Sequence, residues 1–164
     1  MSDQDVGKRK VEEEQVEQFI EEYTRATGSA LKVVKKSERP DFICVRDSGE
    51  KVGLELTWVP TTQDDVVHDL YKSIFVKEEK RIAPPDWTLR DATILVLMLT
   101  EATVGDITER ERSIPRSDFT YTGFVEIWAA DYGSLNIYGF VDLFGLFPDS
   151  WWGHHRKQYP KPYG

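Results

Sequence analysis

Two neighbouring stretches of the chain decide the fold: Arg39-Pro40-Asp41-Phe42-Ile43-Cys44-Val45 and Val52-Gly53-Leu54-Glu55-Leu56-Thr57-Trp58-Val59. Both are short and rich in apolar and β-branched residues, which is typical of strands. The residues between them, Asp47-Ser48-Gly49-Glu50, are typical of a hairpin turn. Each strand also carries one carboxylate, Asp41 or Glu55, where an apolar strand is not expected to have one. The sequence therefore predicts a hairpin that carries two acids.

The segments before and after the hairpin predict helices. A helix over Val11–Ala26 is indicated by apolar residues three to four positions apart, namely Val16, Phe19, Ile20 and Tyr23. A second helix is expected over Asp64–Ile82, with Pro84-Pro85 as its end because proline cannot continue a helix. The most apolar run, Ala92–Leu99, is short and flanked by polar residues, which favours a buried central strand.

Further strands are expected at Leu31–Lys35, Asp41–Arg46, Lys51–Val59 and Phe124–Ala130. The charged segment 109–118 is expected to be a loop or short helix, and 135–147, rich in glycine and aromatics, a hairpin or bent strand. This order predicts an α/β protein, an α/β sandwich with a mixed central sheet. We expect a single domain over 1–164, with its core at about 11–147 and an irregular aromatic and basic C-terminal tail at 148–164.

The 164 residues include 21 Lys and Arg against 29 Asp and Glu, a formal net charge of −8. Such a charge repels nucleic acid at long range and counts against broad non-specific binding. No apolar run approaches the roughly 20 residues that cross a bilayer, and the polar N-terminus does not form a secretory signal. The single cysteine, Cys44, excludes an internal disulfide and is expected in the core. These features predict a cytoplasmic protein with no membrane partner.

The two acids of the hairpin are candidate metal ligands. Mg²⁺ and Mn²⁺ prefer oxygen ligands, usually one or two carboxylates completed by water. Because strand side chains alternate between faces, Glu55 and Thr57 point to one side of the sheet, opposite Leu54 and Leu56. If the strands pair, Asp41 and Glu55 approach each other, and the carbonyl of Leu56 becomes a third candidate ligand.

One further acid is expected from the first helix, where Glu13, or its neighbour Glu12, lies near the apolar stripe. A metal held by these acids would lower the pKa of a bound water and stabilise charge on a scissile phosphate. The alternative for Glu55 is that it lies on a solvated face of the sheet, as most isolated acids in strands do.

A family resemblance follows from Pro40-Asp41, a turn and then Glu55-Leu56-Thr57, in the order helix, strand, hairpin, helix, strand. Over about the first hundred residues, this pattern resembles the PD-(D/E)XK nuclease superfamily, which has a restriction-endonuclease-like α/β/α fold. The resemblance implies that Asp41 and Glu55 bind magnesium and that a lysine two positions after the second acid positions or activates the attacking water. That position is Thr57 here, which departs from the motif. The departure matters because a neutral hydroxyl cannot stabilise a phosphorane charge.

The superfamily tolerates relocated lysines, and the second helix offers Lys72, Lys77 and Lys80. Lys77 lies at the edge of the apolar face of this helix, so it is the candidate to reach the acids. The alternative is that it is an ordinary solvated lysine on an amphipathic helix. The resemblance thus implies a magnesium-dependent nuclease that hydrolyses phosphodiester bonds of nucleic acid. The expected catalytic residues are Asp41, Glu55, Thr57, Lys77 and Glu13. The alternative is a catalytically inactive domain of the same fold, serving as a protein-interaction or structural module.

The C-terminal tail interleaves aromatic and basic residues from Trp151 to Lys161. Such a pattern can bind unpaired bases and phosphates, or form the contact of a homo-oligomer. We favour a third interpretation, in which Trp151 and Trp152 cap the core and the basic residues stay in water. His154 and His155 are adjacent and therefore point apart, so they are not expected to bind one metal ion.

Overall fold

The computed structural model of the chain describes residues 3–81 and 92–157. The described α-helices are α1 (Asp3–Thr27), α2 (Val66–Arg81), α3 (Val104–Glu109) and α4 (Leu135–Tyr138). Three short 3-10 helices are η2 (Glu111–Ser113), η3 (Arg116–Tyr121) and η4 (Asp149–Trp151). The described strands are β1 (Leu31–Lys36), β2 (Phe42–Arg46), β3 (Lys51–Trp58), β4 (Thr93–Leu99), β5 (Glu126–Asp131), β6 (Asp142–Phe147) and β7 (Gly153–His155).

All the described strands join one mixed sheet, in which the spatial order follows the chain from β1 to β7. The central strands β3, β4 and β5 run parallel to one another. The strands on either side of them pair antiparallel. Because parallel neighbours need a crossover, α2 separates β3 from β4, and α3 with η2 and η3 separates β4 from β5. The prediction of an α/β protein with a mixed central sheet is confirmed.

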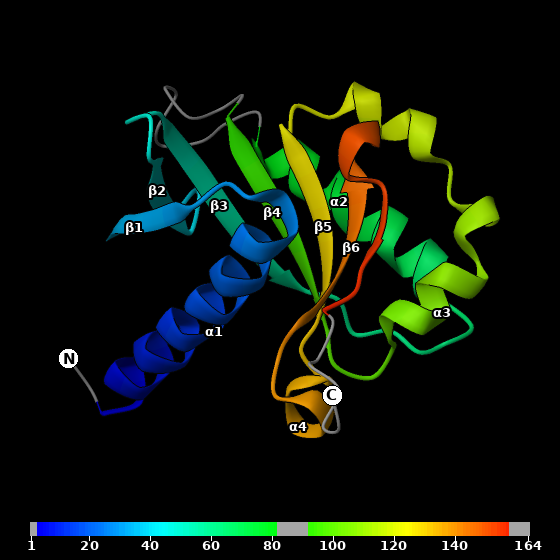
Figure 1. Cartoon of the computed structure of the whole chain (residues 1–164), viewed down its shortest axis with the longest axis horizontal. Coiled ribbons are helices and arrows are strands. Elements are labelled where there is room, and N and C mark those ends of the chain that lie inside the picture. Colours follow the sequence, from blue (N-terminus) through cyan, green and yellow to red (C-terminus); the bar gives the residue numbers. More distant parts are fainter. Residues whose placement is uncertain (1–2, 82–91, 158–164) are drawn as a thin grey trace, which may run out of the picture.

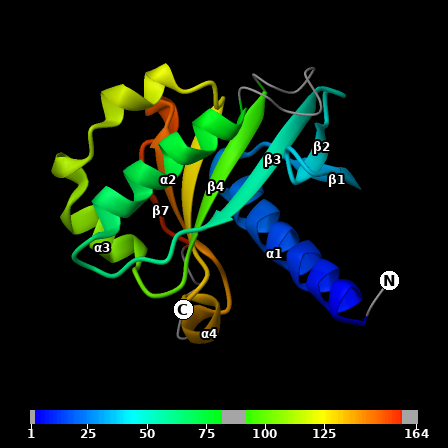
Figure 2. The same cartoon turned by 180° about the vertical axis from the view of Figure 1, so that it is seen from behind.

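Helices cover both faces of the sheet, α1 on one and α2 with α3 on the other (Figures 1 and 2). The predicted apolar stripe of α1 is buried, and it packs against one side of the central strands. In β4 the alternation is visible directly. Ile94, Val96 and Met98 face the α1 side, and Leu95, Leu97 and Leu99 face the α2 side. Burial on both faces explains why this strand is apolar throughout.

Two local expectations need correction. The first helix begins at Asp3 rather than Val11, because the single Gly7 lowers the helix propensity of the preceding segment without ending the helix. The apolar stripe of the helix is the part that packs on the sheet. Helix α3 was not predicted, yet it carries a sequence signal. The hydroxyl of Thr103 accepts from the N–H of Asp106, and the Asp106 carboxylate accepts from the N–H of Thr103. This reciprocal pair is a capping box.

The C-terminal segment is less irregular than expected. It forms η4 and then β7, which extends the sheet by pairing with β6. Trp151 packs against the α1-side core and Trp152 against the α2-side core, so the interpretation that these rings cap the core is confirmed. The expectation that the basic residues stay in water is wrong for Lys157, whose Nζ lies 3.3 Å from the buried carboxylate of Glu22. The segment 135–147 contains α4 and a single strand, β6, rather than a hairpin of its own. The homo-oligomer contact stays a prediction.

Three further expectations concern Cys44, the end of the second helix and membrane-spanning segments. Cys44 is buried, as predicted. Pro84-Pro85, the expected end of the second helix, lies outside the described residues. Among the helices in the described ranges, none is both long and apolar enough to cross a membrane.

Candidate functional site at the acid-bearing hairpin

The pairing of β2 with β3 places Asp41 beside Glu55. Phe42 lies opposite Leu54 in the antiparallel register. The residue before Phe42 therefore meets the residue after Leu54. The hairpin forms as the sequence predicts, and it brings Asp41, directly before β2, close to Glu55 within β3.

A close backbone approach fixes the start of β2. A Cβ atom at Gly53 would stand 2.5 Å from Pro40 Cγ and 2.8 Å from Thr93 Oγ1. A larger residue would push Pro40 away from β3, so this position requires glycine. Since Asp41 follows Pro40 directly, the same contact fixes the backbone from which the first acid projects.

Asp41 is partly buried, and its carboxylate Oδ2 accepts a hydrogen bond of 2.9 Å from the N–H of Leu56. Burial, followed by the negative charge of Glu55, raises the pKa of Asp41 from its ordinary 3.8 to about 6. The hydrogen bond from Leu56 and the charges of Lys77 and Lys36 lower the pKa, but they do not offset these two effects. The two acids are therefore close enough to repel each other, as ligands of one cation do before it binds.

Glu55 points toward α2, where Lys77 Nζ donates a hydrogen bond of 3.1 Å to its Oε1. Both side chains are largely buried, with 14% of Glu55 and 22% of Lys77 exposed. Leu54 and Leu56 pack on the α1 side, so the predicted alternation of faces is confirmed. Lys77 is thus not a solvated lysine, and it reaches one of the acids from the second helix.

The structure brings Glu12 rather than Glu13 to the site. Glu12 lines a cavity of about 130 Å³ together with Asp41, whereas Glu13 is exposed to solvent. The reason is helical spacing. Glu12 lies four residues before the buried Val16 and shares its face, while Glu13 is rotated from it by about 100°. Glu12 also forms an ion pair with Lys36 of β1.

Thr57, which occupies the motif's lysine position, lines a groove together with Lys77. The backbone N–H of Leu56 is used to hold Asp41. The role of the Leu56 carbonyl as a metal ligand stays a prediction. The part of the chain that the structure describes holds no group of three or more His, Cys, Asp or Glu side chains arranged as metal ligands. A magnesium site needs fewer, because one or two carboxylates with water suffice.

Two residues near the acids were not singled out from the sequence. Lys36 and Trp58 line the same cavity as Asp41. Lys36 lies just beyond the predicted strand Leu31–Lys35, but in the structure it ends β1 opposite Phe42, and its Nζ lies 4.9 Å from the centre of that ring. For Trp58 a signal existed. It ends an otherwise apolar strand, and alternation places it on the same face as Leu56.

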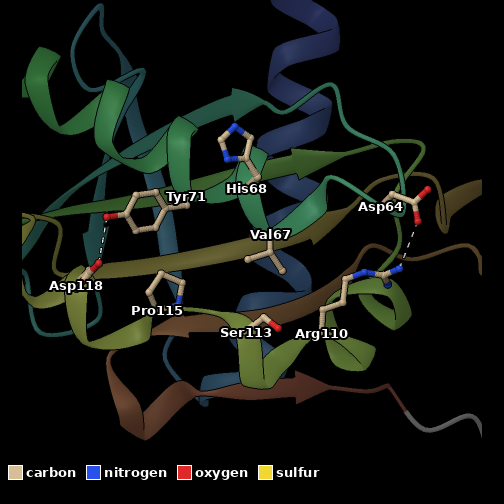
Figure 3. A pocket seen from close by; sticks show the side chains of 8 residues that line it. All are labelled: Asp64, Val67, His68, Tyr71, Arg110, Ser113, Pro115 and Asp118. Atoms are coloured by element: carbon tan, nitrogen blue, oxygen red, sulfur yellow. Dashed lines mark hydrogen bonds and ion pairs between the residues drawn. The ribbon is translucent and has the colours of Figure 1, made fainter.

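A second pocket, of about 580 Å³, lies on the outer side of α2 (Figure 3). His68 is one of its lining residues. The Tyr71 hydroxyl donates a hydrogen bond of 3.0 Å to Asp118 across it. Arg110 and Asp64 approach within 3.7 Å at its other end. These contacts join α2 and the loop before it to the segment after α3. Among the described residues, His68 belongs to no group of three or more potential metal ligands.

The two C-terminal histidines have separate partners. His154 Nε2 lies 2.8 Å from a carboxylate oxygen of Asp142, and His155 Nε2 lies 2.8 Å from the carbonyl oxygen of Trp151. The expectation that the two rings diverge is confirmed. They serve different contacts at the edge of the sheet.

The chain was compared with protein-family models, curated proteins and solved structures, and it matches none of them.

Proposed function

We propose that the protein is a magnesium-dependent nuclease of the restriction-endonuclease-like fold that hydrolyses phosphodiester bonds of nucleic acid. One observation carries the proposal. Lys77, on α2, reaches within 3.1 Å of Glu55, beside Asp41. This position supplies the cation that the PD-(D/E)XK motif places two residues after its second acid, where this chain has Thr57.

The donor set fits a hard divalent cation. Asp41 and Glu55 supply carboxylate oxygens, and their mutual repulsion, which contributes to the raised pKa of Asp41, is relieved by a cation between them. Mg²⁺ or Mn²⁺ bound there would lower the pKa of a bound water and neutralise charge on the phosphate. The proposal assigns the metal to Asp41 and Glu55, with the Leu56 carbonyl as a further ligand.

The remaining side chains have roles that follow from their positions. Lys77 holds a positive charge where negative charge develops on the phosphate during in-line attack by water. Thr57 lines the site without a charge. Glu12, paired with Lys36 across the cavity, takes the auxiliary position that the sequence assigned to Glu13.

One observation favours the alternative, an inactive domain that serves as a protein-interaction or structural module. The ion pair between Lys77 and Glu55 is largely buried and neutralises Glu55 within the chain. Ion pairs of this kind also occur where there is no catalysis. In that case the pair joins α2 to β3 and no metal is needed.

Calorimetric titration with Mn²⁺ separates the two proposals. The wild type is expected to bind Mn²⁺ at millimolar concentration or below, and Glu55→Ala to lose this binding. Glu13→Ala is the matched control, because its carboxylate is on the same molecule but exposed. If the wild type takes up no Mn²⁺, the nuclease proposal is wrong and the structural role is favoured.

A further inference from the structure

A groove of about 420 Å³ lies between the C-terminal end of β3 and the helix α2. Its β3 side is formed by residues 57–60. Its α2 side is formed by residues three or four positions apart along the helix: Asp69, Lys72, Ser73, Val76, Lys77 and Lys80. This spacing puts them on one stripe of the helix. Lys77, which pairs with Glu55, is one of these residues, so the groove adjoins the acid pair.

The groove is lined by lysines. Lys72 and Lys80 are exposed, and none of the ion pairs found among residues 3–81 and 92–157 involves either of them. They lie eight residues apart, which is about 12 Å along a helix. Lys72 and Lys80 outnumber the one acid that lines the groove, Asp69. On a chain of net charge −8, this strip is therefore a local cationic surface. The field of the molecule would repel a polyanion elsewhere and attract it here.

Trp58 stands at the junction of the two sites. It lines both the lysine groove and the cavity that contains Asp41. Its ring lies 5.9 Å from that of Tyr132, yet 46% of its surface is exposed. Trp58 thus shares the groove lining with Lys72 and Lys80, and an indole that stays this exposed has the character of a stacking platform for an unpaired base.

We propose that this groove binds a single strand of nucleic acid, with Lys72 and Lys80 on its phosphates and Trp58 stacked on one of its bases. The inference rests on the proposed function, which it deepens by naming the form of the substrate. Lysines alone would bind a duplex as readily as a single strand. Stacking on Trp58 requires a base that is free of its partner, and this contact selects the single strand.

Fluorescence anisotropy tests the proposal on the full-length protein in EDTA, where metal-dependent cleavage cannot proceed. The probes are a labelled 20-nucleotide single strand, as DNA and as RNA, and the corresponding DNA duplex. The wild type is expected to bind at least one single strand more than tenfold tighter than the duplex. The DNA and RNA arms show which sugar is accepted.

The lysines and the tryptophan give separable signatures. The double variant Lys72→Ala/Lys80→Ala is expected to weaken single-strand binding at least tenfold. It should also reduce the slope of log K against log salt concentration by about 1.4, roughly 0.7 for each lost phosphate contact. Trp58→Ala should weaken binding about tenfold without changing that slope, and Trp58→Phe should restore part of the loss.

Matched controls keep these results interpretable. Lys51→Ala removes an exposed lysine at the other end of β3, and Tyr121→Ala removes an aromatic ring that is 81% exposed elsewhere. Neither should change binding, and circular dichroism verifies that every variant is folded. The proposal is overturned if Lys51→Ala weakens binding as much as the double variant does, if the duplex binds as tightly as the single strand, or if no oligonucleotide binds.

Failure of this inference differs from failure of the proposed function. Anisotropy in EDTA reports only the groove, whereas Mn²⁺ titration reports only the acids. A protein that takes up Mn²⁺ but binds no single strand refutes the groove and leaves the metal site. A protein that binds the strand through Lys72, Lys80 and Trp58 but takes up no Mn²⁺ keeps the groove and loses the nuclease.

Discussion

Two carboxylates at or directly before the start of strands in the same sheet, Glu126 and Asp41, have different surroundings. Glu126, at the start of β5, is 6% exposed. It accepts hydrogen bonds from the Tyr23 hydroxyl (2.9 Å) and the Trp128 indole N–H (2.9 Å). Arg46 Nη2 donates a third, of 3.2 Å, to the same carboxylate. This acid has a cation and neutral donors on both oxygens, which satisfies a buried charge.

Asp41 has a different environment. It accepts one hydrogen bond, from a backbone N–H, and its neighbour Glu55 is another acid. A buried carboxylate whose oxygens all accept hydrogen bonds contributes to the fold. A carboxylate that faces a like charge has a raised pKa and marks a candidate functional site. The clearest difference between the two acids is therefore in their local partners.

The largest expected effect comes from breaking the satisfied cluster. Arg46→Ala leaves Glu126 as a buried charge without its cation, and we expect the free energy of unfolding to fall by about 3 kcal/mol or more. Urea unfolding at pH 7 measures it. Lys77→Ala is the comparison, because it removes one hydrogen bond from a slightly more exposed pair, and it should cost less, about 2 kcal/mol. Equal losses in the two variants would contradict the contrast between the regions.

The next effect concerns catalysis rather than stability. Under the proposed function, Lys77→Ala should lower nuclease activity about 100-fold, because it removes the charge that the proposal places opposite the transition state. Thr57→Lys in that background restores the motif's own lysine and should recover at least about tenfold of the loss, which a merely structural role for Lys77 would not produce. Activity on a single-stranded oligonucleotide with Mn²⁺ is the measurement, and Lys51→Ala is the control.

The pH dependence of stability distinguishes Asp41 from a structural acid. Its pKa is about 6 in the fold against an ordinary 3.8, so the folded state binds the proton more tightly than the unfolded state does. The ionised carboxylate therefore opposes folding. Its cost is absent below about pH 4 and complete above about pH 6.

Asp41→Asn removes this cost and keeps an acceptor for the Leu56 N–H. In metal-free buffer at pH 8 the variant should be more stable than the wild type by about 1–2 kcal/mol, less than full linkage because Asp41 is partly exposed. The difference should vanish as the pH falls toward 4. Thermal unfolding across this range measures it, and a difference that is constant with pH would exclude the ionisation of Asp41 as its cause.

The smallest effect tests the choice between two neighbouring acids. Glu12 lines the cavity with Asp41, and Glu13 does not. We expect Glu12→Gln to lower activity about tenfold, in the range of residues that support metal ligands, and Glu13→Gln to leave it unchanged. The reverse result would restore the original assignment from the sequence.

Much of the fold could be predicted because its signals are local. Local patterns predict three elements directly: α1 from its helical period, β3 from its alternation and β4 from its apolar run. Alternation also placed Glu55 and Thr57 on one face, and the edge position of Lys77 predicted its reach. The segment near 103–106 could have been assigned from its capping box.

What could not be predicted depends on contacts between distant segments. Nothing in the residues around His154 indicates that β7 pairs with β6, since strand pairing is decided by the rest of the sheet. Whether Glu12 or Glu13 faces the cavity depends on how α1 is rotated about its axis on the sheet. A rotation equivalent to one residue, about 100°, would exchange the two side chains. In the sequence Glu126 is an acid without an evident partner. Its hydrogen-bond donors, Tyr23 and Arg46, are distant in the chain and are recognised only in the structure.

The strictly consecutive strand order has a consequence for how the molecule assembles. Every pairing among the described strands joins strands that follow each other in the chain. The parallel pairings of β3, β4 and β5 span long crossovers, whereas β2 and β3 are joined by a short turn, so the β2–β3 pairing has the smaller loop to close. Asp41 and Glu55 lie on one hairpin closed by a four-residue turn. We expect their spacing to be set early and to survive damage at the far edge, and pulse-labelled hydrogen exchange at Cys44 and Leu54 during refolding would detect it.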